Sequence, residues 1–313
     1  MEKIEKLVII GSGPAGLTAA IYSARGNLNP VMVAGRVAGG QLTLTTDVDD
    51  FPGFPEGIQG PDLMVNMRKQ AEKFLTRFID EDVVSVDFKQ KPFIIQTESQ
   101  TLKAQSVIIA TGASAKWLNL ESEQKFIGRG VSACAVCDGF FFKDKTILVI
   151  GGGDTAMRET QHLAKFGKKV ILMHRRSEFR AQAALVNLVK SKTNVEFLMN
   201  FNLEEVLGEQ KVTGVKIKNV ETGEIKQLEM DGVFIAIGHK PNTDFLKGQI
   251  DLDEQGYIKV LDEIKSSVEG IFVAGDVADH RYRQAVTAAG AGCKAALDAE
   301  SFLEQLHVVE VTT

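Results

Sequence analysis

Cysteine and long apolar runs are both scarce in this sequence. Only three cysteines occur among 313 residues, too few for the disulfide framework of a small secreted domain, although a pair can serve redox chemistry or metal binding. No apolar run approaches the roughly 18 residues that a membrane-crossing helix needs. The first six residues form a charged lead into a strand, without the apolar region of a secretory signal. We therefore expect a cytoplasmic protein with no membrane partner.

An excess of positive charge is also missing. Acidic residues outnumber basic residues by 41 to 36, for a formal charge of −5, which excludes a protein that binds nucleic acid mainly by neutralising phosphates. Apolar residues make up 44% of the chain and charged residues 25%, as in ordinary globular proteins. The length favours about two domains.

A glycine-rich loop follows a predicted strand twice in the chain. Residues 6–10 form a short apolar run that leads into the loop 11–16 and then into a predicted helix over 17–25. Residues 146–165 repeat this order. Strand, glycine loop and helix are typical of dinucleotide-binding folds, because the glycines permit a tight turn, close approach to a pyrophosphate and close helix packing. A glycine-rich turn without a ligand is the alternative.

A second repeated segment supports a duplication. Residues 106–112 and 232–238 each read as an apolar strand that ends at a glycine. Each follows its glycine loop at a similar distance, which is a duplication signal at the scale of a domain. Strands that alternate with helices indicate parallel sheets with helical crossovers. We therefore predict an α/β fold of the doubly wound class, with two Rossmann-like dinucleotide-binding domains.

The alternation of strands and helices breaks near residues 113–117 and again near 241–245. Beyond the second break lie a predicted strand over 270–274 and an alanine- and glycine-rich helix over 284–299, but no further glycine loop. This segment is expected to complete the first domain. The predicted domains are a discontinuous one, 1–114 with 245–313, and an inserted one, 115–244.

The two halves differ in the residues that come after their second strand. After the strand at 30–33, residues 34–36 offer no carboxylate where the fingerprint places the acid that binds a ribose. Either other groups hold that ribose or this register is off.

The corresponding strand of the second half, 169–173, leads into basic residues. They are His174, Arg175 and Arg176, with Arg180 four residues further on. Guanidinium groups bind phosphate in a bidentate manner, so this cluster favours the 2′-phosphate of NADPH over NADH. A basic solvated turn is the alternative. His174 is expected to be structural or to face the adenine.

Cys134 and Cys137 are separated by two residues, a spacing that can close a small disulfide and can lower the pKa of one thiol. Zinc is one alternative, but a structural zinc site needs four ligands. Neither Cys293 nor any of the five histidines has a suitable spacing. A purely structural pair is the other alternative. We favour thiol–disulfide exchange and predict no metal.

Two features near these cysteines each have two interpretations. Asp138 is either a general acid for a departing thiolate, if burial raises its pKa, or a turn former before Gly139. Residues 140–142, all phenylalanine, are either an apolar wall beside the dithiol or part of the core. Cys293 lies among small residues and is interpreted as a packing residue.

These residues together resemble one family, the low-molecular-weight, bacterial-type thioredoxin reductases, from Leu7 to about Glu300. The resemblance rests on Gly39-Gly40-Gln41-Leu42, Phe51-Pro52-Gly53-Phe54, Ala110-Thr111-Gly112, Ser132 to Gly139, Gly151 to Ala156, His174 to Arg176, Gly275-Asp276 and Arg283 to Val286. It implies a class II pyridine nucleotide-disulfide oxidoreductase that contains FAD, uses NADPH, reduces thioredoxin and forms a homodimer.

The resemblance also implies the residues of each site. FAD would be held by Gly11, Ser12, Gly13, Pro14, Ala15, Gly16, Gly40, Gln41, Leu42, Ala110, Thr111, Gly112, Gly275, Asp276, Arg283, Gln284 and Ala285. NADPH would be held by Gly151, Gly153, Asp154, Thr155, Ala156, His174, Arg175, Arg176 and Arg180. Electrons would pass from NADPH through FAD to the Cys134–Cys137 disulfide and on to thioredoxin. Cys137 would face the flavin, Cys134 would attack the substrate, and Asp138 would be the acid.

The sequence departs from the family pattern at three positions. Val37 stands where many relatives have an acid near the FAD ribose, Arg158 where the family often has Glu, and Ser177 where it often has Asp. The last two make the surroundings of the nicotinamide cofactor more basic or less acidic than usual, so the cofactor preference can shift.

The order of the motifs raises a geometric difficulty. The dithiol and the NADPH loop share one inserted domain, yet both must reach the same flavin in the other domain. We therefore predict that residues ~115 to ~245 rotate against the FAD domain about two short connectors. Rival functions are a ferredoxin–NADP reductase-like flavoprotein, which would leave the two cysteines without a task, a reductase of small disulfides, and a slow flavin-binding redox sensor.

Overall fold

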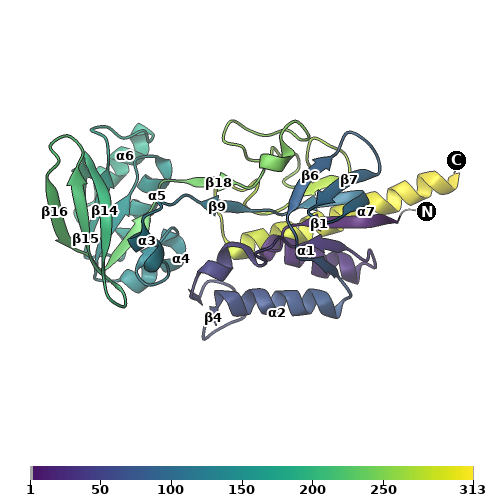
Figure 1. The fold of residues 1–313 in the computed structure, drawn as a ribbon, viewed down its shortest axis with the longest axis horizontal. Helices are drawn as coiled ribbons and strands as arrows, with labels where there is room; N and C mark the ends of the chain where they lie inside the picture. Colours follow the sequence, from purple (N-terminus) through teal and green to yellow (C-terminus); the bar gives the residue numbers. More distant parts are fainter. Residues whose placement is uncertain (1–2, 313) are drawn as a thin grey trace. The chain divides into compact units, whose positions relative to one another are not determined.

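The computed structural model describes residues 3–312, with side chains through Val308. The chain divides into two compact units (Figure 1): unit 1 comprises the residues up to 114 and those from 240 onward, and unit 2 comprises 115–239. The second boundary was expected after residue 244 and lies after His239 instead. Residues 242 and 243 are hydrogen-bonded to unit 1, because the Asn242 N–H donates to the Gly112 carbonyl (3.0 Å) and the Thr243 hydroxyl donates to the Gly256 carbonyl (2.7 Å).

Unit 1 is built on a seven-stranded sheet. Its order is β5-β2-β1-β8-β7-β6, and β19 also pairs with β8. The strands are β1 (Ile4–Ile10), β2 (Val31–Val33), β5 (Arg77–Ile79), β6 (Val83–Asp87), β7 (Phe93–Thr97), β8 (Thr101–Ile109) and β19 (Ile271–Val273). The pairs among β5, β2, β1, β8 and β19 are parallel, whereas β6, β7 and the start of β8 form an antiparallel meander.

Strand β1 is buried on both faces, which explains its continuous apolar sequence. Leu7 and Ile9 belong to the core beneath the helices, and Val8 and Ile10 belong to the core on the other side. The helices of unit 1 are α1 (Pro14–Arg25), α2 (Gly60–Lys73) and α7 (Ala285–Thr312). Helix α7 extends beyond the predicted end at residue 299, because no glycine or proline follows to stop it. Short elements are β3 (Asp47–Val48), β4 (Ile58–Gln59), η1 (Gly40–Leu44) and η3 (Asp244–Leu246).

Unit 2 repeats the central arrangement of unit 1. Its parallel sheet has the order β10-β17-β11-β12-β13. A separate antiparallel sheet has the order β14-β15-β16. The strands are β10 (Val131–Ser132), β11 (Thr146–Ile150), β12 (Lys169–His174), β13 (Val195–Met199), β14 (Phe201–Gly208), β15 (Val212–Asn219), β16 (Ile225–Glu229) and β17 (Gly232–Ile235). As β1 lies between β2 and β8, so β11 lies between β12 and β17. The predicted α/β class with two Rossmann-like halves is confirmed.

The helices of unit 2 are short. They are α3 (Glu121–Lys125), α4 (Ala135–Asp138), α5 (Asp154–Leu163), α6 (Ala183–Lys190) and the 3-10 helix η2 (Gly139–Phe142). The chain passes between the units twice, in β9 (Ala113–Ala115) and β18 (His239–Pro241), which pair with each other as a two-stranded sheet. Within residues 3–312, no helix is both long and apolar enough to cross a membrane.

Candidate functional site

The first glycine loop connects β1 to α1 through three glycines with different tasks. Gly11 has a φ of +106°, and a Cβ there would lie 2.3 Å from the Ala110 carbonyl oxygen. A Cβ at Gly16 would lie 1.9 Å from the Gly11 carbonyl oxygen, whereas a Cβ at Gly13 would meet nothing within 4 Å. The first and third glycines therefore allow close packing inside the protein, and the second leaves an open approach for a ligand.

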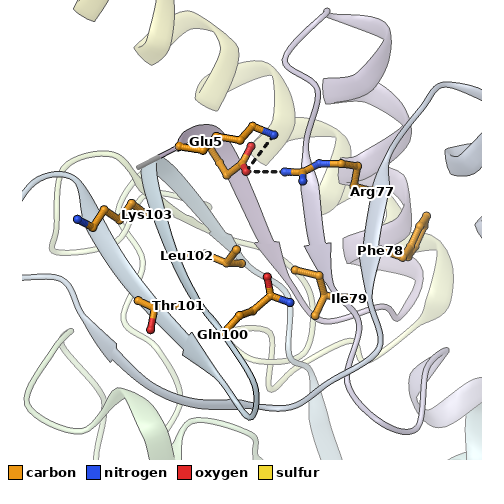
Figure 2. Close-up of a pocket in the computed structure, with 9 residues that line it drawn as sticks. Glu5, Arg77, Phe78, Ile79, Gln100, Thr101, Leu102 and Lys103 are labelled. Atoms are coloured by element: carbon orange, nitrogen blue, oxygen red, sulfur yellow. Dashed lines mark ion pairs between the residues drawn. The ribbon is translucent and has the colours of Figure 1, made fainter. Parts of the chain in front are cut away.

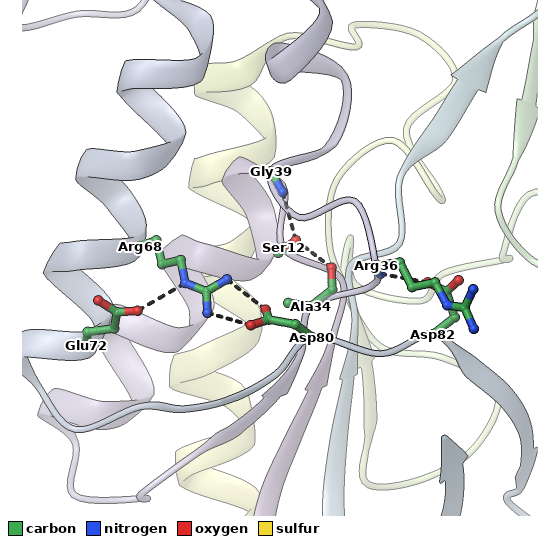
Figure 3. Close-up of polar contacts among 8 residues, drawn as sticks. All are labelled: Ser12, Ala34, Arg36, Gly39, Arg68, Glu72, Asp80 and Asp82. Atoms are coloured by element: carbon green, nitrogen blue, oxygen red, sulfur yellow. Dashed lines mark hydrogen bonds and ion pairs between the residues drawn. The ribbon is translucent and has the colours of Figure 1, made fainter. Parts of the chain in front are cut away.

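The N-terminus of α1 has free backbone N–H groups that can bind an anion. Its N-cap is Gly13 and no side chain caps it, so the N–H groups of the first turn remain available to a ligand. Ser12 points elsewhere: its hydroxyl donates to the Ala34 carbonyl (2.6 Å) and accepts from the Gly39 N–H (2.9 Å) (Figure 3). This pair of bonds brings the segment that begins η1, with Gly40, Gln41 and Leu42, to the loop.

We expect Gly16→Ala and Gly13→Ala to separate these roles. Gly16→Ala forces a Cβ into a backbone oxygen, so it should lower the free energy of unfolding by about 1–3 kcal/mol, the usual cost of overpacking. Gly13→Ala adds a Cβ in open space, so it should leave unfolding of the ligand-free protein unchanged while weakening dinucleotide binding. Urea unfolding and cofactor titration measure the two effects. Equal destabilisation by both variants would contradict this division.

The ends of β8 and β19 lie at the same edge of the sheet as this loop. The two strands are parallel neighbours, so Ala110-Thr111-Gly112 and Gly275-Asp276 follow them side by side. A Cβ at Gly275 would lie 3.0 Å from the Ala15 Cβ. Arg283, Gln284 and Ala285 lie where α7 begins. Unit 1 thus contains all five stretches of the first predicted site, 11–16, 40–42, 110–112, 275–276 and 283–285.

Asp276 shows that a polar ligand fits this edge. Its Oδ1 is shielded from solvent and has no hydrogen-bond partner within residues 3–312. Burial raises the pKa of this carboxyl to about 7, with a further contribution from Asp279 and an opposing one from Arg283. A buried acceptor without a partner is costly. A hydroxyl-bearing chain, such as the ribityl of a flavin dinucleotide, would satisfy it.

The ligand-free protein is therefore expected to lose stability as the pH rises toward 7. The folded state keeps the Asp276 proton up to about pH 7, whereas the unfolded carboxyl releases it near its ordinary value of 3.8. Between these values the folded state binds more protons, so the free energy of unfolding falls with pH, by about 4 kcal/mol at most. Asp276→Asn should remove this fall. Urea unfolding at pH 5 and pH 8 measures this fall in the free energy of unfolding. Asp251→Asn is the control, because Asp251 is an exposed carboxylate of unit 1. The same fall with pH in Asp276→Asn as in the native protein would refute the prediction.

The second glycine loop, between β11 and α5, shows a similar pattern of close and open positions, although Gly151 does not share the positive φ of Gly11. A Cβ at Gly151 would lie 2.3 Å from the Ala236 carbonyl oxygen and 2.7 Å from the Ala156 Cβ, whereas a Cβ at Gly153 would meet nothing within 4 Å. Gly153 is the N-cap of α5 and no side chain caps this helix. Unit 2 therefore presents a second anion-binding turn, next to Thr155 in the first turn of α5.

The basic segment after β12 is attached to this loop at three points. The His174 ring stacks on Phe179 (centroids 5.6 Å apart) and lies against Gly152. The Arg180 N–H donates to the Gly152 carbonyl (2.8 Å). The Asp154 carboxylate accepts from the backbone N–H (2.8 Å) and the side-chain amide (2.9 Å) of Gln182. The hydrogen bonds of Asp154 and the ring contacts of His174 thus hold the basic segment against the glycine loop.

The three arginines of this segment, Arg175, Arg176 and Arg180, are exposed. Among the described residues none of the three forms an ion pair. Burial lowers the pKa of His174, and the charge of Arg180 lowers it further, so this buried imidazole stays neutral beside them. The Nε2 of His174 has no hydrogen-bond partner within residues 3–312. The arginines are the groups that this unit offers to a phosphate.

Cys134 and Cys137 are joined in a disulfide with their Cα atoms 5.4 Å apart. Cys134 is the N-cap of α4, and its Sγ accepts from the Cys137 N–H (3.2 Å). Ser132 holds the approach to the turn, since its hydroxyl accepts from the Cys134 N–H (3.0 Å). Cys137 is exposed and Cys134 half-buried. No cluster of three or more metal-binding side chains occurs in the described part of the chain, and the two sulfurs are bonded to each other.

The residues after the disulfide divide between core and surface. Asp138 is half-buried, and its N–H donates to the Cys134 carbonyl (3.1 Å). Phe142 packs on Phe234 with ring centroids 5.2 Å apart. Phe140 and Phe141 are exposed, at 68% and 44% of their surface. The phenylalanine run is therefore part core and part surface beside the disulfide.

Asp82 is a carboxylate that sequence reasoning missed. It follows β5, and its Oδ1 accepts from the Arg36 N–H (3.1 Å) at the end of β2, where the fingerprint places the ribose acid (Figure 3). Asp82 lies 46 residues after Arg36 in the chain, so no register of the second strand could have found it. Val37, one of the departures from the family pattern, is 78% exposed. Arg158 and Ser177 are also exposed.

A cavity of about 740 Å³ lies at the opposite end of the unit 1 sheet, beside the start of β1 and β8 (Figure 2). Its buried carboxylate, Glu5, pairs with Arg77 (2.5 Å) and Lys3 (3.2 Å). The glycine loop follows the other end of β1, so this cavity is separate from the candidate cofactor site. Cys293, in α7, is a half-buried free cysteine.

Comparison with known proteins agrees with this geometry. The family model of the pyridine nucleotide-disulphide oxidoreductases matches residues 5–292. A thioredoxin reductase of Streptomyces coelicolor is 50% identical over 309 residues, which cover 98% of this chain and 96% of that protein. A glucosaminate ammonia-lyase of Pseudomonas fluorescens is 49% identical over 311 residues, 96% of this chain and 97% of that protein. The structure of a thioredoxin reductase from Giardia duodenalis superposes with a TM-score of 0.93 at 43% identity, covering 97% of this chain and 100% of that one.

Proposed function

Since this chain belongs to the pyridine nucleotide-disulphide oxidoreductase family, in its low-molecular-weight thioredoxin reductase branch, we propose that Cys134 and Cys137 are its exchanging dithiol. It is an NADPH-dependent flavoprotein oxidoreductase, and its cofactors are FAD and NADPH. The observation that carries the proposal is the closed, partly exposed disulfide at the start of α4. Thioredoxin is the disulfide substrate that this branch implies.

Unit 1 would hold FAD. The pyrophosphate would lie on the uncapped start of α1 beside Gly13, and Asp276 would accept a hydrogen bond from a hydroxyl of the ribityl chain. Asp82 would take the part of the absent ribose acid. Arg283, Gln284 and Ala285 would approach the ring system from the start of α7. When bound, FAD accepts a hydride from NADPH and delivers a pair of electrons to a disulfide.

Unit 2 would hold NADPH. The pyrophosphate would lie on the start of α5 beside Gly153, and Arg175, Arg176 and Arg180 would surround the 2′-phosphate. Asp154 and His174 would act through the protein, because their contacts hold the arginine-bearing segment against the loop.

The exchange with thioredoxin uses the two sulfurs in turn. After two electrons have opened the disulfide, the Cys134 thiolate attacks the disulfide of thioredoxin and forms a mixed disulfide, which releases one thioredoxin thiolate. The Cys137 thiolate then attacks the Cys134 sulfur, which closes the internal disulfide and releases the second thiolate. Asp138, whose backbone N–H is hydrogen-bonded to the Cys134 carbonyl, would supply a proton to a departing sulfur.

One dithiol and one nicotinamide must reach the same flavin, so unit 2 would rotate against unit 1 between the two half-reactions. The chain passes from unit 1 to unit 2 in β9 and returns in β18, and such short connectors suit a hinge. A covalent cross-link that fixes one orientation should stop steady-state turnover while leaving one half-reaction intact. Full turnover in the cross-linked protein would refute the rotation.

The function is tested with the purified flavoprotein, NADPH and oxidised thioredoxin. Thioredoxin thiols should appear with NADPH and much more slowly with NADH. A reaction without thioredoxin should reduce the Cys134–Cys137 pair only, as alkylation and mass measurement would show. Parallel reactions with a small disulfide, with ferredoxin and with glucosaminate test the rival functions, the last because one relative has that name. A reducible flavin without formation of thiols would favour the redox-sensor alternative and overturn the proposal.

Cellular location and assembly are inferred from the same branch. We place the protein in the cytoplasm, where reduced thioredoxin works and where a chain with so few cysteines is not expected to need structural disulfides. We also propose a homodimer. Analytical ultracentrifugation of the flavoprotein would find a species of twice the chain mass, and a monomer at micromolar concentration would contradict it.

A further inference from the structure

Asn242 binds the stretch that follows β8 through its backbone and through its side chain. Its backbone N–H donates to the Gly112 carbonyl (3.0 Å), and its backbone carbonyl accepts from the Thr111 hydroxyl (2.9 Å). Its side-chain Nδ2 donates to the Thr111 carbonyl (2.8 Å), and its Oδ1 accepts from the Ser114 hydroxyl (3.1 Å). We call these four hydrogen bonds the Asn242 clamp. They connect parts of unit 1 that lie far apart in the chain, 131 residues for Asn242 and Thr111.

The Asn242 clamp holds the backbone at the point where the sheet no longer does. The Ala110 N–H donates to the Ile10 carbonyl (2.8 Å), so the residue after β8 is still tied to β1. Thr111 and Gly112 lie between the end of β8 and the start of β9, outside both strands. Their two carbonyls accept from the same residue, Asn242. A single asparagine therefore sets the orientation of two successive peptide groups.

These peptide groups lie at the edge of the sheet that carries the candidate FAD site. The Ala110 carbonyl oxygen is the nearest atom to a Cβ added at Gly11, so the stretch borders the first glycine loop. Gly112 has a φ of +68°, and a Cβ there would meet nothing within 4 Å, which leaves its backbone open to a ligand. The Thr111 hydroxyl is bound within the clamp. In the proposed FAD site this stretch would therefore contact the dinucleotide through its backbone, in the orientation that the clamp imposes.

The clamp also lies at the unit 1 end of both connectors. Strand β9 begins directly after Gly112, and β18 ends directly before Asn242. The bond from Ser114 extends the clamp into β9 itself. The residue after Asn242, Thr243, is buried and its hydroxyl donates to the Gly256 carbonyl (2.7 Å), so the chain beyond the clamp is anchored in unit 1. A bend in the connectors would move the stretch after β8 unless the clamp held it.

We propose that Asn242 is a positioning residue for electron transfer, whose clamp keeps the flavin-contacting backbone of Thr111 and Gly112 fixed while β9 and β18 bend. This inference rests on the proposed function and adds the residue that separates the moving connectors from the flavin site. The groups proposed to bind NADPH belong to unit 2, whereas the clamp belongs to unit 1. Loss of the clamp should therefore change the retention of FAD and the rate of electron transfer, but not the affinity for NADPH.

The test compares Asn242→Asp with Asn66→Asp in the flavoprotein. The first substitution replaces the Nδ2 donor with an acceptor oxygen 2.8 Å from the Thr111 carbonyl and keeps the size of the side chain. The second is the matched control, because Asn66 is an exposed asparagine of α2 in unit 1. The lost hydrogen bond and the unpaired acceptors correspond to about a tenfold effect. Release of FAD from the diluted protein, followed by flavin fluorescence, should be about tenfold faster in Asn242→Asp and unchanged in the control.

Steady-state kinetics with excess FAD provide a second readout. In Asn242→Asp the kcat for thioredoxin reduction should fall about tenfold, because the backbone around the flavin is no longer held in place. The KM for NADPH should stay constant, whereas a general disturbance of the fold would raise it. Ser114→Ala removes only the bond to Oδ1 of Asn242, so it should cause smaller changes in the same direction.

Unchanged FAD release and kcat in Asn242→Asp would overturn the inference. A rise in the KM for NADPH that accounts for the lost activity, or equal effects in Asn66→Asp, would also overturn it. A native protein that binds FAD but forms no thioredoxin thiols would instead refute the proposed function. The two failures are distinguishable, because the release of FAD is measured without thioredoxin.

Discussion

Cys137→Ser should abolish NADPH-dependent reduction of thioredoxin, with a fall in kcat of at least about 10³-fold. A serine hydroxyl cannot close a disulfide with Cys134, so the electron pair has no route from the flavin to the substrate. Cofactor binding should survive, because Cys137 is exposed at the start of α4 and lies outside both glycine loops. The flavin should still bleach with NADPH.

Cys134→Ser should be equally inactive with thioredoxin, since either substitution removes half of the exchanging pair. Cys293→Ser is the control, because Cys293 is a half-buried free thiol in α7. It should keep nearly full activity. Thioredoxin reduction by Cys137→Ser at more than a tenth of the native rate would show that another thiol carries the electrons.

Replacing Arg175, Arg176 and Arg180 together with alanine should remove the preference for NADPH. Charge-assisted hydrogen bonds contribute about 1.5–3 kcal/mol each, so the loss of two corresponds to roughly 10²–10⁴ in kcat/KM. The effect should appear in the KM for NADPH, while the kinetics with NADH stay nearly constant. The fold of unit 2 should be retained, because these side chains are exposed and form no ion pair with the described residues.

Steady-state kinetics with both nicotinamides measure this change, and Arg129→Ala is the matched control. Arg129 is an exposed arginine of the same unit that donates to the Lys125 carbonyl (2.6 Å). The Arg129→Ala substitution should leave the ratio of the activity with NADPH to the activity with NADH unchanged. An equal loss of activity with NADPH and NADH in the triple variant would mean that the arginines support the fold or the pyrophosphate and not the 2′-phosphate.

Local sequence was sufficient for features that one turn of chain defines. Gly11, Gly13 and Gly16 lie within six residues, and the backbone approach at each follows from its place between a strand and a helix. The same holds for the second loop and for the disulfide, whose spacing alone allows closure. The α/β class followed from the alternation of strands and helices, which is also a local property.

Other features depend on residues that are far apart in the chain. Asp82 reaches Arg36 only because β2 and β5 are neighbours in the sheet, and Asp276 is left without a partner only because β19 lies beside β8. Unit 2 ends at His239, and Asn242 belongs to unit 1, where it is hydrogen-bonded to Gly112, 130 residues earlier in the chain.

The amino-acid sequence alone thus supplied the groups on which the proposed chemistry rests: two glycine loops, a pair of cysteines and an arginine cluster, each contained in a short stretch whose conformation depends on near neighbours. Folding decided which of these groups are left to bind something. The buried acceptor of Asp276 and the attachment of Asp154 to Gln182 arise when distant segments pack together. Burial and pairing are properties of that packing, and no pattern along the chain specifies them.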